Sequence, residues 1–397
     1  MSDLNLNKIP ISATSDFSVP ANIRAISPYR AGKPSSELAR EFGLEPASIV
    51  KLASNENPLG FSPRVKQALI DYLSTSSLAE LGRYPDPNAF DLKAVLAQHY
   101  GVEMANLTIG NGSNDLLEII SLAFLDEHSS AVYSEHAFVV YKLSTQARGA
   151  RHLAVSTKGL GLDLERMYEA IEEDTRLVYI ANPNNPTGTF HPRDDIIAFL
   201  DRVFASRGNK TLVVLDEAYN EYLDPELRFN SAELIKHYPN LVVLRTFSKA
   251  YGLAGLRVGF AIAQSEVTDY LNRVRQPFNV NTLAQIAAMV ALEDEEFLAQ
   301  SYQMNKAGKA YLSAEFERMG IAYVPSFTNF ILFEMNEAPK VAEALLAKGV
   351  IVRPVVGDGL PNHLRVSIGT EEENQRFIAA LKAVSYTHLT LPTTPYV

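Results

Sequence analysis

The chain contains no cysteine among its 397 residues. This absence excludes disulfides, cysteine-based zinc and iron–sulfur sites, and catalysis by a thiol nucleophile. The eight histidines are scattered, and none forms a His-x-x-x-His pair beside a carboxylate. We therefore expect no metal site built from protein side chains.

Basic residues are too few for a protein whose main partner is nucleic acid. The 36 lysines and arginines are outnumbered by 46 acidic residues, which gives a formal net charge of −10. Binding to a phosphate backbone needs a basic face, so we expect no nucleic-acid partner, and any bound anion must be held locally. The N-terminus lacks the apolar core of a secretory signal, and no apolar run has membrane-spanning length. We expect a cytoplasmic protein with no membrane partner.

The composition is that of a globular protein, with 47% hydrophobic and 21% charged residues. The length suits two domains, or one large layered domain with an appendage. We predict a loose arm over 1–20, a large α/β domain over 61–275, and a small α+β domain formed by 21–60 and 276–384. Residues 385–397 break helical spacing and contain two prolines and four threonines, and we interpret them as a non-native tail.

Short, continuously apolar runs alternate with helical patterns between residues 90 and 265. Strands that are apolar on both faces belong to a sheet covered by helices on each side. The pattern therefore predicts an α/β layer fold with a mainly parallel sheet. The runs are Ser130–Tyr133, Leu177–Ile180, Thr211–Leu215, Leu241–Leu244 and Val258–Ala263.

The chain changes character from about residue 275 onward. A long helical pattern covers 281–318, and further helices are expected at 338–348 and 371–384. We expect these helices to alternate with three strand-like segments, at 328–334, 350–355 and 363–368. The pattern predicts an α+β appendage to the large sheet.

One lysine, Lys249, follows an apolar run within the stretch Thr246–Gly259, between Ser248 and Arg257. Ligands of such sheets bind at the carboxyl ends of the strands. An ammonium group in an apolar setting loses hydration, so its pKa falls and the amine can form a Schiff base with an aldehyde. We interpret this aldehyde as that of pyridoxal phosphate. The alternative is that Lys249 is a solvated surface lysine.

A second motif, Gly110–Asp115, leads into a helical pattern over Leu116–Leu125. Free backbone N–H groups and the helix dipole at such a start suit a phosphate group. The alternative is a capped helix with no ligand.

Two further motifs follow predicted strands. In Asn182–Gly188, two prolines and a glycine constrain the turn and can hold the Asn185 amide over a ligand. In Asp216–Tyr219, a carboxylate at the end of a buried strand is costly unless it meets a cation or a hydrogen-bond network. A pyridinium nitrogen would be such a cation, and the alternative is an ordinary helix N-cap.

Together these motifs resemble the fold-type-I aminotransferases, the aspartate aminotransferase superfamily, over residues 20–384. The resemblance implies a seven-stranded, mainly parallel sheet and pyridoxal 5′-phosphate as the cofactor, with Lys249 as the catalytic Schiff-base lysine. It also implies that Asp216 pairs with the pyridine nitrogen and that Asn185 and Tyr219 contact the cofactor's 3′-oxygen. The other implied cofactor contacts are Ser113, Asn114, Ser248 and Arg257 at the phosphate and Phe138 stacked on the ring.

Tyr84, in an Arg-Tyr-Pro-Asp stretch, matches a tyrosine of this superfamily that reaches the phosphate from the other subunit. The resemblance therefore implies a homodimer in which Tyr84 completes the neighbouring site.

Within the superfamily, the pattern is most similar to the histidinol-phosphate aminotransferases. The similar motifs are Ser27-Pro-Tyr, Asn55-Glu-Asn-Pro, Tyr84-Pro, Gly110-Asn-Gly-Ser, Val352-Arg-Pro and Leu364-Arg-Val-Ser-Ile-Gly-Thr. The similarity implies amino transfer between glutamate/2-oxoglutarate and imidazole-acetol phosphate/L-histidinol phosphate, in histidine biosynthesis. It makes Arg365 the side chain that binds the glutamate carboxylate and the substrate phosphate, for which a planar guanidinium is suited. The other implied substrate-binding residues are Tyr29, Asn55, Asn329 and Arg353.

Three alternatives remain open at this point. Aromatic amino-acid aminotransferases and threonine-phosphate decarboxylases share most of these residues. A ligand-sensing regulator could use the same body without turnover, but such regulators carry a separate basic DNA-binding module. The arm over residues 1–20 is too short for one.

Overall fold

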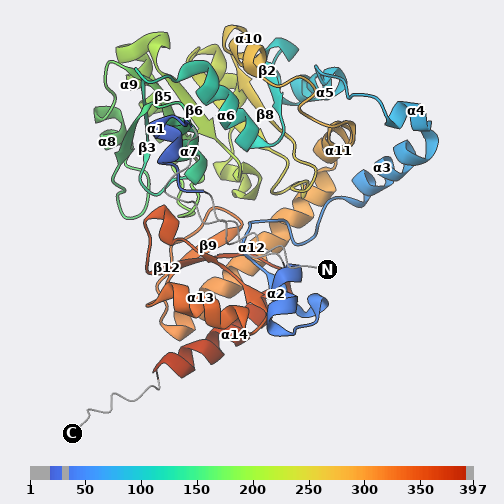
Figure 1. The fold of residues 1–397 in the computed structure, drawn as a ribbon, viewed down its shortest axis with the longest axis vertical. Coiled ribbons are helices and arrows are strands. Elements are labelled where there is room, and N and C mark those ends of the chain that lie inside the picture. The colour runs from blue at the N-terminus through green and yellow to red at the C-terminus, as the bar shows by residue number, and fades with distance from the viewer. Residues whose placement is uncertain (1–17, 29–34, 390–397) are drawn as a thin grey trace.

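The computed structural model of the chain describes residues 18–28 and 35–389. In Figure 1, a large α/β body lies above a smaller α+β body, and the long helix α12 runs from one to the other. Most of the predicted arm, together with Tyr29 and the end of the predicted tail, lies outside the described residues. Within the described ranges, no helix combines the length and the apolar character needed to span a membrane.

The helices are α1 (Ala21–Arg24), α2 (Ser35–Phe42), α3 (Pro63–Thr75), α4 (Leu78–Leu81), α5 (Phe90–Tyr100), α6 (Ser113–Phe124), α7 (Val139–Ala147), α8 (Leu164–Glu169), α9 (Arg193–Arg207), α10 (Ser265–Val274), α11 (Thr282–Leu292), α12 (Glu295–Met319), α13 (Ala338–Leu346) and α14 (Glu371–Leu389). The strands are β1 (Val50–Lys51), β2 (Leu107–Gly110), β3 (Ser130–Ser134), β4 (Arg151–Val155), β5 (Thr175–Ala181), β6 (Leu212–Asp216), β7 (Leu241–Thr246), β8 (Gly259–Ala263), β9 (Phe330–Glu334), β10 (Val350–Ile351), β11 (Arg353–Pro354) and β12 (His363–Ser367).

The large sheet has seven strands in the order β2-β8-β7-β6-β5-β3-β4. Strand β8 pairs antiparallel with both neighbours, and the other pairs in the sheet are parallel. This confirms the predicted α/β fold with a mainly parallel, seven-stranded sheet. Because β5, β6 and β7 run in the same direction, their carboxyl ends meet at one edge of the sheet.

Each face of the large sheet is covered by helices, as continuous apolar strands require. Along β5, Val178 and Ile180 face one layer, and Leu177 and Tyr179 face the other. Helices α5, α8, α9 and α11 pack on the first face, and α6, α7 and α10 on the second. Fully burying a side chain such as leucine or isoleucine stabilises a fold by about 1.5–3 kcal/mol, so this double covering fixes the strands from both sides.

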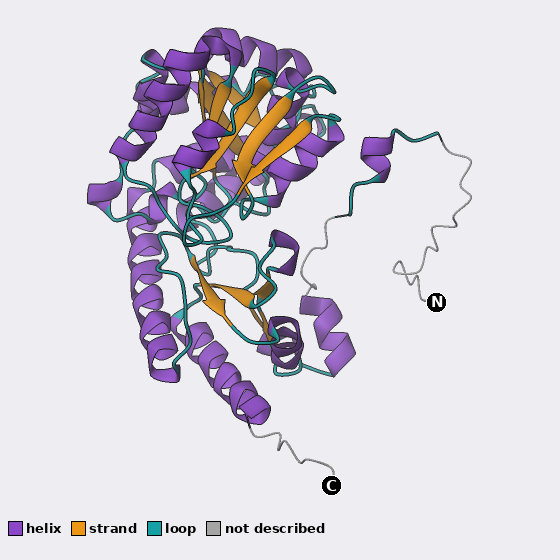
Figure 2. Ribbon diagram, turned by 90° about the vertical axis from the view of Figure 1, so that its left-hand side faces the viewer, coloured by secondary structure: helices purple, strands orange, loops and turns teal. Residues whose placement is uncertain are grey.

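The small body contains a three-stranded antiparallel sheet in the order β11-β12-β9 and a parallel pair, β1 and β10. Its core joins α12 and α14 to β9 through Phe316, Phe377 and Phe333, and α13 adds Val341 and Leu345. Figure 2 shows the large sheet and the strands of the small body separated along the molecule. Strand β1 brings the chain into this body early, so residues 52–60 lead from it towards the carboxyl edge of the large sheet.

Three sequence-based expectations need correction here. The pattern over 281–318 is two helices: α11 ends at Leu292, and Asp294 caps α12 by accepting a hydrogen bond from the Phe297 amide. The segment 350–355 is two short strands that pair in different sheets. The closing helix α14 extends to Leu389, beyond the expected end near residue 384.

The predicted domain boundaries stay a prediction. Helix α11 contributes Ala284 and Ala288 to the core beneath the large sheet, beside α3 and α5. We therefore propose that the large domain continues past residue 275 and that the boundary lies at the start of α12.

Candidate active site

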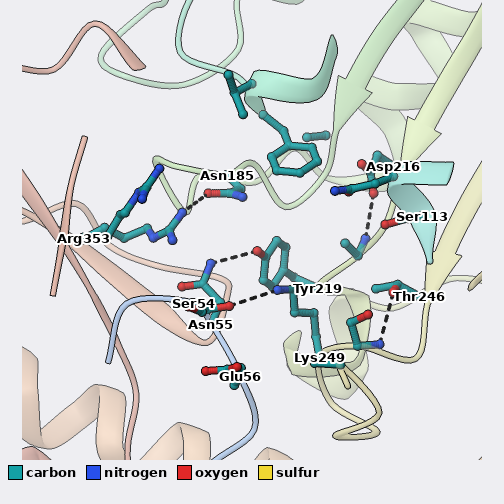
Figure 3. Close-up of a pocket in the computed structure, with 18 of the residues that line it drawn as sticks. Ser54, Asn55, Glu56, Ser113, Asn185, Asp216, Tyr219, Thr246, Lys249 and Arg353 are labelled. Atoms are coloured by element: carbon teal, nitrogen blue, oxygen red, sulfur yellow. Dashed lines mark hydrogen bonds between the residues drawn. The ribbon is translucent and has the colours of Figure 1, made fainter. Parts of the chain in front are cut away.

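A cavity of about 540 Å³ lies at the carboxyl ends of β5, β6 and β7. Its walls come from both bodies: residues 51 and 53–56, Arg353 and Arg365 from the small one, and the ends of the parallel strands from the large one. In Figure 3, Lys249 and Tyr219 lie in the middle, with Asp216 on one side and Arg353 on the other. The volume falls in the range of cofactor and substrate sites.

Lys249 follows the end of β7 and points into this cavity. Its Nζ donates a hydrogen bond to the Ser54 carbonyl oxygen at 3.3 Å and lies 5.8 Å from the centre of the Tyr219 ring. Burial lowers the pKa of the Lys249 amine to about 8, and the guanidinium charges of Arg365 and Arg257 act in the same direction. This placement rules out the solvated surface alternative and leaves about a tenth of the amine neutral at pH 7.

Asp216 ends β6 and is almost fully buried. Burial raises the pKa of its carboxyl group, and hydrogen bonds from Tyr141 and the Ala218 amide oppose that rise. The Tyr141 hydroxyl donates to Asp216 Oδ2 at 2.8 Å, while the Tyr141 ring stacks on Tyr179 with centroids 4.7 Å apart. The carboxylate is therefore oriented by a rigid donor but has no cationic partner within hydrogen-bond distance among the described residues.

Tyr219 is held over the cavity by the small body. The side-chain amide of Asn55 donates a hydrogen bond to the Tyr219 hydroxyl oxygen at 2.9 Å. Burial raises the pKa of Tyr219 to about 12, although Arg365 and Asn55 partly offset it. Tyr219 is thus a neutral phenol at physiological pH, able to donate its proton in a hydrogen bond.

The start of α6 forms a cradle with Arg257. Gly112 has φ +87°, and a Cβ placed on it would come 2.6 Å from Arg257 Nη2. A Cβ on Gly259 would come 2.9 Å from the Ser113 amide nitrogen, so both glycines are needed for this close approach. First-turn amides of a helix lack intrahelical acceptors, and together with the helix dipole and a guanidinium they form an anion site.

A second basic region lies at the opposite end of the cavity. Arg353 on β11 and Arg365 on β12 are directly opposite each other in an antiparallel pair, so their side chains leave the same face. Arg365 Nη1 donates to Asn185 Oδ1 at 2.5 Å, and Nη2 donates to the Ala53 carbonyl oxygen at 3.0 Å. Two fixed guanidinium groups can bind a carboxylate or phosphate with several charge-assisted hydrogen bonds.

Most of the predicted site residues line this one cavity. They are Asn55, Ser113, Asn114, Phe138, Asn185, Asp216, Tyr219, Ser248, Lys249, Arg257, Arg353 and Arg365. Their individual roles stay predictions.

Three predicted residues are placed differently. Asn329 is buried behind the cavity, where its amide donates to the Asn55 carbonyl oxygen at 2.9 Å, so it supports Asn55 from outside the lining. Tyr84 lies outside the cavity of its own chain, 79% exposed and stacked on Phe278. Tyr29 falls outside the described residues.

The sequence motifs did not identify Tyr141, Ser54 or Asp358 as lining residues. Tyr141 could have been found, because it lies three residues after Phe138 and so on the same helix face. Ser54 contributes a carbonyl oxygen, which no side-chain motif reveals. Asp358 lies near Arg353 and Arg365, and burial raises the pKa of its carboxyl group.

The cavity fits pyridoxal phosphate on three observations of the structure. The first-turn residues Ser113 and Asn114 line the cavity together with Arg257, whose guanidinium packs on Gly112, and this combination of helix start and cation suits a phosphate. The buried Asp216 carboxylate matches a protonated ring nitrogen, since an opposite charge favours its ionised form. Lys249 supplies an amine of lowered pKa, the group that reacts with an aldehyde.

Comparisons with known proteins agree with this geometry. The family model for aminotransferase class I and II matches residues 47–381. Histidinol-phosphate aminotransferase 1 of Cupriavidus pinatubonensis is 54% identical over 367 residues, which cover 91% of this chain and 95% of that protein. Histidinol-phosphate aminotransferase 2 of Ralstonia nicotianae is 53% identical over 368 residues, which cover 92% of this chain and 96% of that protein.

A solved structure is similar over nearly the whole fold. It is the histidinol-phosphate aminotransferase of Sinorhizobium meliloti in complex with pyridoxal-5′-phosphate, with a TM-score of 0.83 and 28% sequence identity. The match covers 95% of this chain and 99% of that chain. The chain belongs to the class I and II aminotransferase family.

Proposed function

We propose that this enzyme transfers the amino group of glutamate to imidazole-acetol phosphate, giving 2-oxoglutarate and L-histidinol phosphate in histidine biosynthesis. The observation that carries the proposal is the pair of guanidinium groups, Arg353 and Arg365, in the cavity that also holds Lys249. The planar fork of arginine suits both the glutamate carboxylate and a substrate phosphate. Relatives with this name that are identical at about half of the aligned positions support the assignment.

Pyridoxal 5′-phosphate is the cofactor, and when bound it supplies an aldehyde that takes up the amino group and a ring that accepts electrons from the reacting carbon. We assign its phosphate to Ser113, Asn114, Ser248 and Arg257 at the cradle. Asp216, oriented by Tyr141, holds a proton on the ring nitrogen.

The amine of Lys249 carries the proton between the reacting carbons. A general base works best when its pKa lies near the operating pH, and burial brings the pKa of Lys249 to about 8. The Ser54 carbonyl oxygen and the Tyr219 ring restrict where this amine can point. Arg365 fixes the substrate anion and at the same time binds Asn185, so anion binding and the cofactor contact are linked through one side chain.

We further propose a homodimer and a cytoplasmic location. Support for the dimer comes from an exposed apolar stretch, which we call the α3–α5 surface: Ile70, Leu73, Leu78, Tyr84 and Phe90. In Figure 1, α3 and α4 project from the edge of the large body. Large exposed apolar areas on a globular protein indicate an interaction surface, and a second copy of the chain is the occupant we propose. Cell fractionation tests the location.

The test is a direct comparison of amino acceptors with purified protein and glutamate. We expect the highest kcat/KM with imidazole-acetol phosphate, compared with phenylpyruvate as the aromatic acceptor. Threonine phosphate is tested separately for release of carbon dioxide. A clear preference for phenylpyruvate, or decarboxylation of threonine phosphate without amino transfer, would contradict the proposal. Lys249→Ala is the inactive control, and borohydride should trap no cofactor on it.

A further inference from the structure

A buried cluster of charges lies behind the active-site cavity, on the far side of the strand ends that carry the site. Arg245 Nη1 donates to Glu217 Oε2 at 2.6 Å, and Arg245 Nη2 lies 3.1 Å from Glu221 Oε1. Glu217 also accepts a hydrogen bond from the Ser231 hydroxyl at 2.6 Å. Arg245 and Glu217 are 8% and 2% exposed, and neither lines the cavity. The cluster therefore takes no direct part in binding a ligand there.

The three charged residues lie close in the chain to the predicted catalytic residues. Glu217 directly follows Asp216, and Glu221 comes two residues after Tyr219. Arg245 precedes Lys249 by four residues, at the end of the neighbouring strand β7. Side chains alternate between the two faces of a strand. The Arg245 guanidinium therefore links two segments from the side away from the cavity. One segment carries Asp216 and Tyr219, and the other carries Lys249.

The backbone ties the same two segments together. Asp216 on β6 is in register with Leu244 on β7, and the Glu217 amide donates to the Leu244 carbonyl oxygen at 3.0 Å. Beyond these bonds β6 ends and the chain continues as irregular turns towards Tyr219, whereas β7 continues through Arg245 and Thr246, which pair with Phe260 and Gly259 of β8. The Arg245 ion pairs therefore tie the irregular segment after β6 to a strand whose backbone the sheet still fixes.

We propose that Arg245 is a positioning residue for the reaction: by bridging Glu217 and Glu221, it holds the segments of Asp216, Tyr219 and Lys249 in the register that pyridoxal phosphate binding requires. The reacting groups must keep their relative positions closely, because displacements of about 1 Å can cost about 10²-fold in rate. A buried ion pair restricts the positions of both charged groups. A buried carboxylate that loses its partner keeps a charge that neither water nor a cation compensates.

Two further contacts make the guanidinium rigid. Arg245 Nη2 donates to the Tyr100 hydroxyl at 3.3 Å, and the Arg245 Cζ lies 5.4 Å from the centre of the Tyr100 ring. These contacts anchor the cluster to α5, an element of the large body that does not reach the cavity. The cluster therefore fixes the segments that carry the site relative to α5 and the rest of the large body. This positioning role differs from a contribution to stability alone.

The experiment uses Glu217→Gln and Arg245→Met. The first keeps the shape and the hydrogen bond to Ser231 but removes the charge, so it carries the test alone if Arg245→Met does not fold. At a temperature well below each unfolding midpoint, two quantities are measured: the Kd of pyridoxal phosphate for the cofactor-free protein, and the pH midpoint of the bound cofactor's visible absorbance. We expect the Kd to rise about tenfold or more and the pH midpoint to shift.

The matched control is Glu315→Gln in the small body. Glu315 is likewise a buried carboxylate with two cationic partners, Arg318 and Lys382, but it lies far from the cavity lining. We expect this variant to lower the unfolding midpoint while leaving the Kd of pyridoxal phosphate within about twofold. If Glu217→Gln and Arg245→Met are also destabilised with an unchanged Kd and pH midpoint, Arg245 has only a structural role and the proposal is overturned.

This inference rests on the proposed function only in taking pyridoxal phosphate as the ligand. The two can fail separately. Absence of pyridoxal phosphate binding by the unmodified protein would overturn the proposed function, whereas normal binding by the unmodified protein and by both variants would overturn the role of Arg245 alone.

Discussion

The charge on the Lys249 amine depends on its surroundings, because the cavity removes hydration and places two guanidinium groups nearby. These effects lower the pKa of Lys249 to about 8, against about 10.4 for a lysine in an unfolded chain. Between these two values the unfolded chain binds one more proton than the folded protein. Stability of the cofactor-free protein must therefore rise with pH across this window, and the contribution is constant below about pH 8 and above about pH 10.4.

We predict that reductive methylation of Lys249 in the cofactor-free protein rises to half its maximal rate near pH 8. The measurement is peptide mass spectrometry after brief labelling at a series of pH values. The same peptide labelled in denaturant is the reference, where the midpoint should lie near pH 10.4. Lys249→Met should also abolish the rise in unfolding free energy between about pH 8 and 10.4, which amounts to about 3 kcal/mol. A labelling midpoint above pH 10 in the folded protein would contradict the proposed state of this amine.

At the scale of elements, the start of α6 requires a glycine, because a larger residue there would disturb the site. Gly112 precedes the first helical residue, has φ +87°, and lies against Arg257. Gly101 ends α5 with φ +66°, but a Cβ there would meet no heavy atom within 4 Å. Both glycines have positive φ, but Gly112 has ψ 166°, a region that essentially only glycine adopts, whereas Gly101 has ψ 39° in the ordinary left-handed region.

We predict that Gly112→Ala weakens binding of pyridoxal phosphate by more than about tenfold, because the new Cβ displaces the Arg257 guanidinium from the cradle. Gly101→Ala should leave the Kd unchanged. Gly101→Ala should lose about 1 kcal/mol of unfolding free energy, since alanine is strained at positive φ, and Gly112→Ala should lose more, because its backbone region is essentially restricted to glycine. Fluorescence titration of the cofactor-free proteins measures the Kd, and chemical denaturation measures stability. Equal Kd values for the two variants would show that the start of α6 does not bind the cofactor phosphate.

The elements that the sequence predicted well are those that are apolar on both faces. Strands β3, β5, β6, β7 and β8 could be located because each is buried between helical layers. Strand β4 was missed because it is at the edge of the sheet, where Arg151 and His152 are exposed. Strand β2 was missed because Thr108 and Gly110 interrupt its apolar residues, so it does not form a continuous apolar run.

The site was predictable to the extent that each residue belongs to a local motif. Lys249, Asp216 and Tyr219 follow recognisable strands, and the structure brings them into one cavity. The partnership of Arg245 with Glu217 was not predictable, because it depends on the pairing of two strands about 30 residues apart in the chain. Contacts made across the sheet are set by tertiary packing, which sequence spacing does not encode.

At the scale of the whole molecule, the cavity joins two bodies that are folded around separate cores. The small body contributes Asn55, which bonds Tyr219, and Arg365, which bonds Asn185 on the large body. Opening of the cavity would break both hydrogen bonds, so substrate anion binding at Arg365 and orientation of Tyr219 are coupled. The exposed α3–α5 surface lies at the far edge of the large body, where a second copy could add Tyr84 to the neighbouring cavity.

We predict that mixed dimers recover activity when Lys249→Ala and Tyr84→Ala chains are combined. Each mixed dimer then holds one site with its own Lys249 and the partner's Tyr84, provided that Tyr84 acts across the interface. Because one of its two sites is intact, such a dimer should show about half of the unmodified activity. Activity is measured on mixed dimers isolated with two different affinity tags.

The alternative, in which Tyr84 serves the site of its own chain, predicts a different activity for the mixed dimer. If Tyr84 served its own chain, each mixed dimer would contain one site without Lys249 and one without Tyr84, and its activity would not exceed that of the Tyr84→Ala protein. The exposed position of Tyr84, 79% accessible and stacked only on Phe278 among the described aromatic side chains, favours the crossed arrangement. A tyrosine outside its own cavity can reach a cofactor only in a neighbouring one, so activity near half of the unmodified level would identify both the dimer and the direction in which Tyr84 is shared.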